Sequence, residues 1–369
     1  PIPVTINLLD GRRFELQVDS ATTANETIAL LLKRLPLADA SAFALYESFT
    51  YLQEPFTRLE KSLFIEELIC DSLAKLDLVK ATMSYSLFFK RKMYLNPRAP
   101  ISDPVERELM YHQAVFEVNE GTLPVTESDV IRMAALRVQH DMGDMNAGKN
   151  FAVETYIPKH LLKRRIAGAW MDMVRMEYQS LGGTSKAEAQ SQLLSFASQL
   201  AFYGCTIFPV ENTPQNVSRQ LPATFELMVN VDGLHFVRPE NEMRTVFRTL
   251  FFTDVTVDYT MNSVKLVFQE GGQTTLAELL TKRGIEVYNL TQDYMYWLEA
   301  QSEWAVAKQD YDVHDNTLLN FRKGELIHVV DKDVGPEWFM GEIGDRHGLF
   351  PRSSVTVLLR PPPEVLEPK

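Results

Sequence analysis

The sequence predicts a multidomain α+β protein, and three observations support this fold class. The chain has 369 residues, more than a single domain of roughly 100–200 residues needs. Hydrophobic residues alternate with polar ones toward both ends of the chain, but recur at helical spacing in the middle. Apolar residues make up 45% and charged residues 23%, so a sizeable core can be buried and long disordered regions are disfavoured.

Charge and cysteine content limit the classes of partner and site. The 37 basic and 49 acidic residues give a net charge of −12, which repels nucleic acid and, away from local basic clusters, anionic lipid. We therefore expect no nucleic-acid partner. Cys70 and Cys205 are far apart and have no partner at metal-ligand spacing, so neither a disulfide framework nor a zinc site is expected. The absence of a long apolar stretch and of a signal peptide favours a cytosolic protein or a fragment of one.

Residues 1–97 are predicted to form a small lobe rich in strands. Alternating segments on either side of Asp10-Gly11 predict a hairpin, and Thr22 or Thr23 together with Glu26 predicts a helix that begins with a capping box. The expected strands are 4–9, 14–18, 43–46 and 85–94. The capped helix has apolar residues at helical spacing between 28 and 35, before Pro36, and a second helix is expected at 59–76. A hairpin followed by a helix and further strands suggests a ubiquitin-like fold.

Residues 98–208 are predicted to form an all-helical lobe, because glycines and prolines separate amphipathic segments. The expected helices are 106–118, 127–141, 159–165, 167–181 and 186–202. The run 182–186 is glycine-rich and ends in a lysine, but it lies between two helices rather than after a strand. We therefore interpret it as an interhelix loop and not as a phosphate-binding loop.

The C-terminal part is predicted to be a third lobe of strands over 209–302, a smaller β unit over 303–360 and a proline-rich linker over 361–369. In the third lobe we expect strands at 225–229, 234–237 and 264–268, and a closing helix at about 292–301. The segment 274–281 has helix-forming composition, but an apparent hairpin turn at 282–284, before 285–288, favours strand. The smaller unit has turns at Lys323-Gly324, Gly335-Pro336 and Gly344-Asp345.

The order of the first three lobes resembles that of FERM domains, and four segments resemble the FERM domains of unconventional myosin tails. The segments are Leu87–Lys92, Glu108–Val115 with Gly121, Tyr156–Pro158 and Val229–Val237. The resemblance implies a ubiquitin-like β-grasp lobe, an all-helical lobe like acyl-CoA-binding protein, and a PH/PTB-like β-sandwich with a C-terminal helix.

The unit over 303–360 resembles an SH3 domain and is expected to be a small SH3-like β-barrel. The matching segments are Ala307–Tyr311, Leu319–Glu325, Trp338 and Gly348–Pro351. A FERM domain followed directly by such a domain resembles the tails of class VII-like and class XV-like MyTH4-FERM myosins. In those tails a MyTH4 domain precedes the FERM domain.

The ligand surface of the SH3-like unit is expected to be reduced. Gln309, Leu349 and Ser354 stand where aromatic residues are usual, and Leu318 stands where an acidic residue is usual, which leaves Tyr311, Trp338 and Pro351. Each buried ring contributes roughly 1.5–3 kcal/mol, whereas a micromolar ligand has only about 8 kcal/mol in total. We therefore interpret the unit as a spacer or an atypical binder. The short junction between Gln301 and Trp304 favours rigid docking on the FERM domain.

The resemblance also implies a peptide-binding groove in the third lobe, between an edge strand and the closing helix. The expected strand is Val264–Phe268. The predicted groove residues are Lys265, Leu266, Phe268, Tyr294, Trp297, Leu298 and Gln301. The alternative for Trp297 and Leu298 is that they are ordinary core residues. Myosin-tail FERM domains also bind cargo in the cleft between their first and third lobes.

A basic cluster in the second lobe is a candidate site for anionic lipid. It consists of Lys159, Lys163, Arg164 and Arg165, and each basic residue near a membrane contributes roughly 1 kcal/mol. The alternative is a helical turn whose basic side chains are simply exposed to solvent.

The sequence contains no catalytic or cofactor motif: no P-loop, no His-Glu-x-x-His and no nucleophile elbow. We therefore expect no enzymatic activity, cofactor or metal in this chain.

The resemblance implies a tail module of an actin-based motor that binds cargo or adaptor proteins, or a motor or MyTH4 domain of the same protein in autoinhibition. It would act in the cytoplasm, at the cytoskeleton, cell cortex or actin-rich protrusions. The alternative is a membrane–cytoskeleton FERM scaffold that binds phosphoinositides. A regulatory module of a kinase or phosphatase is disfavoured by the trailing SH3-like unit.

Overall fold

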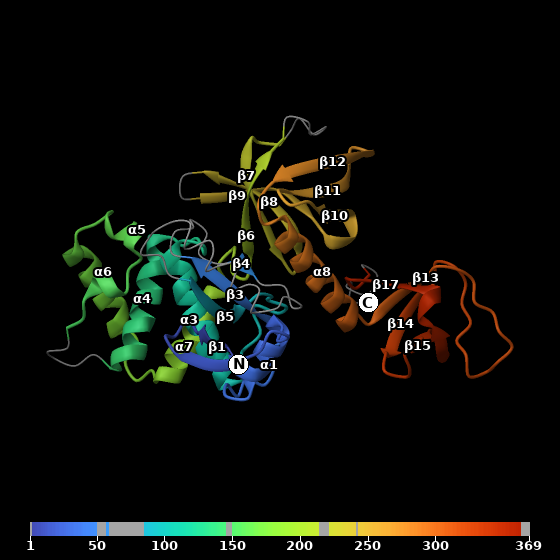
Figure 1. Ribbon diagram of the computed structural model, residues 1–369, viewed down its shortest axis with the longest axis horizontal. Coiled ribbons are helices and arrows are strands. Elements are labelled where there is room, and N and C mark those ends of the chain that lie inside the picture. The colour runs from blue at the N-terminus through green and yellow to red at the C-terminus, as the bar shows by residue number, and fades with distance from the viewer. Residues whose placement is uncertain are drawn as a thin grey trace.

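The computed structural model describes residues 2–49, 57–58, 85–144, 150–213, 221–240 and 243–362. Three lobes and a smaller β unit are present, which confirms the multidomain α+β class (Figure 1). The helical second lobe lies at the left of the view, and the C-terminal unit lies at the right. Among the described residues, no helix is both long enough and apolar enough to span a bilayer.

In its described residues, the first lobe is a five-stranded sheet with a helix packed against it. Its described elements are β1 (Ile2–Asn7), β2 (Arg13–Val18), α1 (Ala24–Leu32), β3 (Phe43–Phe49), β4 (Thr57–Arg58) and β5 (Tyr85–Arg91). The strand order is β2-β1-β5-β3-β4, and β1 runs parallel to β5. The first and last strands therefore lie side by side in the middle of the sheet, as in a ubiquitin-like β-grasp.

Two local features of the first lobe agree with the sequence prediction. The predicted hairpin is confirmed by the pairing of Ile6 with Phe14, and the predicted capping box by the reciprocal bonds of Thr23 and Glu26. The strand β5 ends at Arg91 instead of continuing to residue 94, because three consecutive side chains from Lys92 onward are buried and cannot follow the alternation of a strand. The helix expected at 59–76 lies outside the described residues.

The second lobe is helical, as predicted. Its described elements are α3 (Pro104–Glu120), α4 (Glu127–Met142), the 3-10 turn η1 (Val153–Thr155), α5 (Lys159–Leu162), α6 (Ala167–Gln179) and α7 (Lys186–Ala197). Trp170, Val174 and Tyr178 recur at i, i+4 and i+8 on the buried face of α6. The run 182–186 joins α6 to α7, which confirms the interhelix interpretation, and Ser185 caps α7.

Helix α7 ends at Ala197, before the expected end at residue 202. The chain then turns and brings Gly204, with a φ of +79°, against the first lobe. A Cβ at this glycine would lie 2.8 Å from the Cβ of Tyr94. Only glycine allows this backbone conformation and this close contact, so the end of the helical lobe is fixed against the first lobe.

The third lobe is a seven-stranded sheet closed by a long helix. Its elements are β6 (Thr206–Asn212), β7 (Thr224–Asn230), β8 (Gly233–Glu240), β9 (Met243–Leu250), the 3-10 turn η2 (Phe252–Asp254), β10 (Val255–Tyr259), β11 (Ser263–Glu270), β12 (Gln273–Leu280) and α8 (Gly284–Gln301). The strand order is β10-β11-β12-β6-β7-β8-β9. The preference for strand over 274–281 is confirmed by β12.

The expectation of a hairpin turn at 282–284 followed by a strand is wrong, because α8 begins at Gly284. Two features favour a helix at this point. The guanidinium of Arg283 donates to both carboxylate oxygens of Glu286, at 3.0 and 2.9 Å, across the first turn. The negative charge of Glu286 also lies near the positive end of the helix dipole. Val287 of this turn packs in the core as part of a helix instead of pairing as a strand.

The C-terminal unit has its own sheet and its own hydrophobic core. Its strands are β13 (Trp304–Ala307), β14 (Leu326–Asp331), β15 (Trp338–Ile343), β16 (Arg346–Pro351) and β17 (Val355–Val357), in the order β16-β15-β14-β13-β17, with the 3-10 turn η3 (Arg352–Ser354) before β17. Phe321, Phe339 and Phe350 are at the centre of this core. The first three lobes instead share one continuous core.

Candidate partner-binding site

The third lobe has an open sheet edge beside α8, but its edge strand differs from the predicted one. The expected strand, now β11, is paired with β10 on one side and with β12 on the other, so its backbone groups are already used. Strand β10 is at the edge. Within the described part of the chain, β10 pairs with β11 alone. The free backbone groups of β10 can therefore bind an added strand.

The predicted groove residues do not share one surface. Leu266, Phe268 and Tyr294 are buried in the core. Lys265 faces Glu278 on β12, with 4.0 Å between the charged atoms. Leu298 packs on the shared core, in agreement with the alternative for this residue, whereas Trp297 is half-buried and Gln301 is exposed.

Four apolar side chains gather where β10 meets the first turn of α8. The rings of Tyr259 and Tyr288 are 5.1 Å apart. Met261 in the β10–β11 turn is 88% exposed, and Ile285 on α8 is 37% exposed. We call Tyr259, Met261, Ile285 and Tyr288 the β10–α8 surface. Exposed apolar groups beside a free edge strand form a site to which a peptide can add.

The close contact between α8 and the β10–β11 turn forms this surface. A Cβ at Gly284 would lie 2.4 Å from the carbonyl oxygen of Ser263, so glycine allows the helix to begin directly against the strand. The sequence reasoning missed these residues because it assigned 285–288 to a strand. The acidic Glu286 at the beginning of this apolar run was the available signal for a helix start.

Polar side chains join the first three lobes where they meet. The ammonium group of Lys92, whose side chain is 1% exposed, lies 2.8 Å from the carboxylate of Asp293 on α8. The backbone amide of Tyr94 donates to the hydroxyl oxygen of Tyr294 at 3.1 Å. These two contacts connect the first lobe to the helix of the third lobe.

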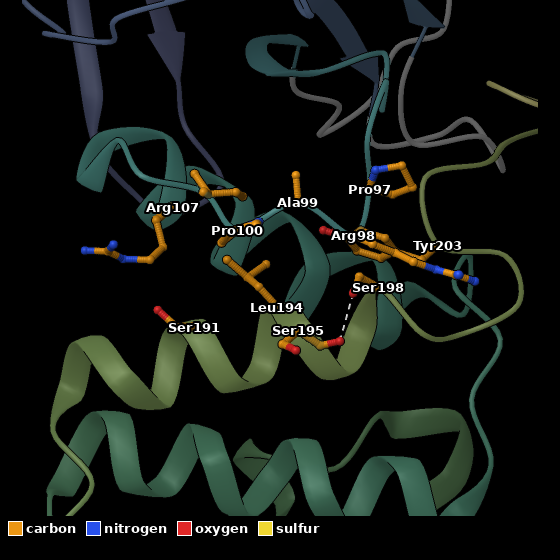
Figure 2. Close-up of a pocket in the computed structure, with 11 residues that line it drawn as sticks. Pro97, Arg98, Ala99, Pro100, Arg107, Ser191, Leu194, Ser195, Ser198 and Tyr203 are labelled. Carbon is orange, nitrogen blue, oxygen red and sulfur yellow. Dashed lines mark hydrogen bonds between the residues drawn. The ribbon is translucent and has the colours of Figure 1, made fainter. Parts of the chain in front are cut away.

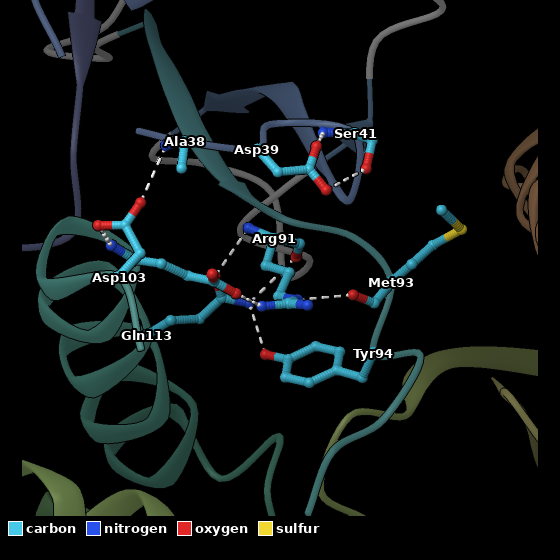
Figure 3. A network of polar contacts seen from close by, with 9 residues as sticks. Ala38, Asp39, Ser41, Arg91, Met93, Tyr94, Asp103 and Gln113 are labelled. Carbon is cyan, nitrogen blue, oxygen red and sulfur yellow. Dashed lines mark hydrogen bonds and ion pairs between the residues drawn. The ribbon is translucent and has the colours of Figure 1, made fainter. Parts of the chain in front are cut away.

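The second lobe is held to the first by a similar network (Figure 3). The side-chain amide of Gln113 donates to the hydroxyl of Tyr94 at 2.9 Å and to the carbonyl of Arg91 at 3.1 Å. Asp103 caps α3 and also accepts a bond from the amide of Ala38 at 2.9 Å. The amide of Ala38 lowers the pKa of the Asp103 carboxyl, which therefore stays ionised as the cap.

Burial keeps two phenols and a thiol near this junction in their neutral forms. It raises the pKa values of Tyr94 and Tyr294, so both phenols stay protonated. It also raises the pKa of the nearby Cys205 to about 12, and Asn230 donates to its sulfur. A thiol in this state is a poor nucleophile and a poor metal ligand. In the described ranges, no three His, Cys, Asp or Glu side chains are arranged to hold a metal ion.

In the C-terminal unit, polar residues occupy two of the positions where SH3 domains usually have aromatic residues. Ser354 is buried, and the amide of Gln309 donates to its hydroxyl at 3.5 Å. The remaining aromatic Tyr311 stacks on Phe321, with 5.4 Å between the ring centroids. Trp338 lies opposite Pro351 in the β15–β16 pairing.

Comparison with known proteins agrees with this architecture. The model of an RA-like domain matches residues 1–93, that of the FERM central domain matches 97–208, and that of a variant SH3 domain matches 304–358. The chain therefore has a FERM-like fold, with the FERM central domain over 97–208, followed by an SH3-like domain. This confirms the resemblance that the lobe order and the motifs indicated.

The relatives include myosin heavy chains. The chain is 25% identical over its whole length to a myosin-I heavy chain of Dictyostelium discoideum and 22% identical over 99% of its length to myosin-VIIa of Drosophila melanogaster. It spans 16% and 18% of those two proteins.

Solved structures share the fold. The MyTH4-FERM MF1 domain of Dictyostelium discoideum myosin VII has a TM-score of 0.64 at 20% identity, over 81% of this chain and 60% of that one. The C-terminal MyTH4-FERM domain of human myosin 7b, in complex with the harmonin-a PDZ3 domain, has a TM-score of 0.61 at 18% identity, over 80% and 60%.

The SH3-like domain is fastened to the FERM domain at two places. At the end of α8, the ammonium group of Lys332 donates to the carbonyls of Glu299 and, at 3.1 Å, of Ala300. Arg352 forms an ion pair of 3.0 Å with the carboxylate of Glu299. Beyond β17, Arg360 lies 3.3 Å from the ring centroid of Phe251 in the third lobe. These contacts support the expectation of rigid docking.

The predicted basic cluster is only partly available to a ligand. Arg164 and Arg165 both approach Glu127, at 3.8 and 2.8 Å. Lys159 and Lys163 are exposed, and so is the neighbouring Ile166, at 79%. The positive charge of the cluster is therefore offset by one carboxylate, and an apolar side chain lies beside it.

Proposed function

We propose that this chain is a non-enzymatic tail module of an actin-based motor that binds cargo or adaptor proteins through its FERM domain. The observation that carries the proposal is the β10–α8 surface, where a free edge strand adjoins exposed apolar side chains. The likeness to myosin heavy chains, and the PDZ domain bound by the myosin 7b structure, support a protein as the partner. The module would act in the cytoplasm, at actin-rich parts of the cytoskeleton.

Binding would proceed by strand addition. An extended partner segment would hydrogen-bond to the outer edge of β10 and bury apolar side chains against Tyr259 and Tyr288. The three lobes, held together at their junction, would present this surface in a fixed shape. A segment of the same motor could occupy it in the same way, which would give an autoinhibited state.

Tyr288→Ala is expected to weaken such binding at least tenfold, because a buried aromatic contact contributes about 1.5–3 kcal/mol. Peptides would be selected from a phage-displayed library on the immobilised protein, and their affinities measured by fluorescence anisotropy. Met261→Asp should also weaken peptide binding, and it should not disturb the core because this side chain is 88% exposed.

The matched control is Tyr296→Ala, which removes a ring of the same helix that is 76% exposed and outside the β10–α8 surface. It should leave the affinities unchanged. Peptides that bind Tyr288→Ala and Met261→Asp as tightly as the unaltered protein would contradict this site.

A second candidate function is that of a membrane–cytoskeleton scaffold that binds phosphoinositides. Exposed Lys159 and Lys163 beside the exposed Ile166 favour it. On this reading, the protein should sediment with vesicles that contain phosphatidylinositol bisphosphate, and the double variant Lys159→Glu, Lys163→Glu should not. Equal sedimentation of the double variant and of a Lys323→Glu control would exclude this patch as a lipid site.

A further inference from the structure

A second groove, remote from the β10–α8 surface, lies between the linker that follows the first lobe and helix α7 (Figure 2). Its volume is about 390 Å³. Its lining consists of Pro97, Arg98, Ala99, Pro100, Ile101, Arg107, Ser191, Leu194, Ser195, Ser198 and Tyr203. The groove therefore has one wall from the linker and the start of α3, and a floor from one face of α7.

The groove is positively charged in an acidic protein. Figure 2 shows Arg107 near one end, above Ser191, and Arg98 at the other end, beside Ser198 and Tyr203. Among the described residues, the lining contains two arginines and no carboxylate, although the whole chain has a net charge of −12.

The floor of the groove is suited to an extended chain. Ser191 and Ser195 of α7 and Ser198 at its C-cap follow each other at i, i+4 and i+7, which places their side chains along one side of the helix. The seven steps from Ser191 to Ser198 span about 10 Å of helix, and an extended peptide covers that length with about three residues. Between the arginines, Leu194 and Pro100 offer apolar contacts to the carbon chain of a glutamate.

We propose that this groove binds an acidic segment of a partner protein, with one carboxylate directed to Arg98 and another to Arg107. Arginine and carboxylate form paired charge-assisted hydrogen bonds, which give the charge complementarity that this proposal needs. The site is separate from the proposed cargo surface and does not depend on it.

A neighbouring hollow limits the direction of the segment. This hollow, of about 320 Å³, shares Arg98 and Tyr203 with the groove and continues toward Asp232 of the third lobe. The carboxylate of Asp232 disfavours an anion there. The acidic segment therefore lies along α7, on the side of Arg98 that leads to Arg107. A membrane is less suitable, because the lining is recessed between the linker and the helix.

The test is the binding of a fluorescein-labelled peptide of alternating glutamate and alanine, followed by anisotropy with the full chain. Arg98→Gln and Arg107→Gln should each weaken binding at least fivefold, and affinity should fall as salt is raised. Arg13→Gln, which removes an exposed arginine of the first lobe, is the charge-matched control and should have no effect.

A second pair of variants does not depend on removing an arginine. Ser195→Glu places a competing carboxylate in the groove and should abolish binding, whereas Gln192→Glu adds the same charge to α7 outside the lining and should not. The proposal would be overturned if a peptide with glutamine in place of glutamate bound with the same affinity. It would also be overturned if the Ser195→Glu and Gln192→Glu variants bound the acidic peptide equally well. Binding only of inorganic phosphate, or only of phosphatidylserine vesicles, in place of the peptide would overturn it as well.

Discussion

Asp293→Ala is expected to destabilise the FERM domain by about 3–5 kcal/mol, since it removes the carboxylate that faces the buried ammonium group of Lys92. Lys92 and Asp293 belong to different lobes, so the loss should loosen the contact between the first and third lobes. Denaturant unfolding followed by circular dichroism measures the stability, and small-angle scattering should show a larger particle.

The expected cause of the lost stability is the broken ion pair, and not the removal of the Asp293 charge alone. The double variant Lys92→Met, Asp293→Leu replaces both charges with apolar groups and should recover most of the lost stability. Asp172→Ala removes an exposed carboxylate of α6 and is the control. If Asp293→Ala unfolds at the same denaturant concentration as this control, the ion pair contributes nothing to holding the lobes together.

Gly348→Val is expected to unfold the SH3-like domain, at a cost of more than about 4 kcal/mol. A Cβ at Gly348 would lie 2.7 Å from the backbone nitrogen of Leu319 and 2.8 Å from the carbonyl carbon of Leu318. Both contacts are with backbone, so a side-chain movement cannot relieve them. Because this domain has a core of its own, the FERM domain should remain folded.

Differential scanning calorimetry distinguishes the two domains. The variant should lose one unfolding transition and keep the other, whereas Ser353→Val, which adds bulk at an exposed position, should keep both. Loss of both transitions in Gly348→Val would mean that the FERM domain requires the SH3-like domain to fold.

The features that could be predicted from the sequence depend on neighbouring residues. The hairpin around Asp10-Gly11 and the capping box of Thr23 and Glu26 are fixed by contacts within a few positions. Helix periodicity likewise predicted the second lobe, where α6 buries every fourth side chain. The order of such elements was then sufficient to indicate the FERM and SH3-like architecture.

The site could not be predicted in the same way, because it depends on pairing between distant strands. Nothing local distinguishes β10, which lies at the sheet edge, from β11, which lies inside it. The apolar run that begins at Ile285 fits either a strand or a helix, and only its contact with the sheet decides. The same limit applies to Lys92 and Asp293, which meet although 201 positions separate them.

Helix α8 also has a mechanical consequence. Its 18 residues span about 27 Å, with the β10–α8 surface at its first turn and the Lys332 and Arg352 contacts at its last. A partner that pulls on the first turn would load the helix along its axis, and the force would pass into the SH3-like domain without crossing a flexible hinge. Such a path would carry tension from a bound partner directly into the SH3-like domain.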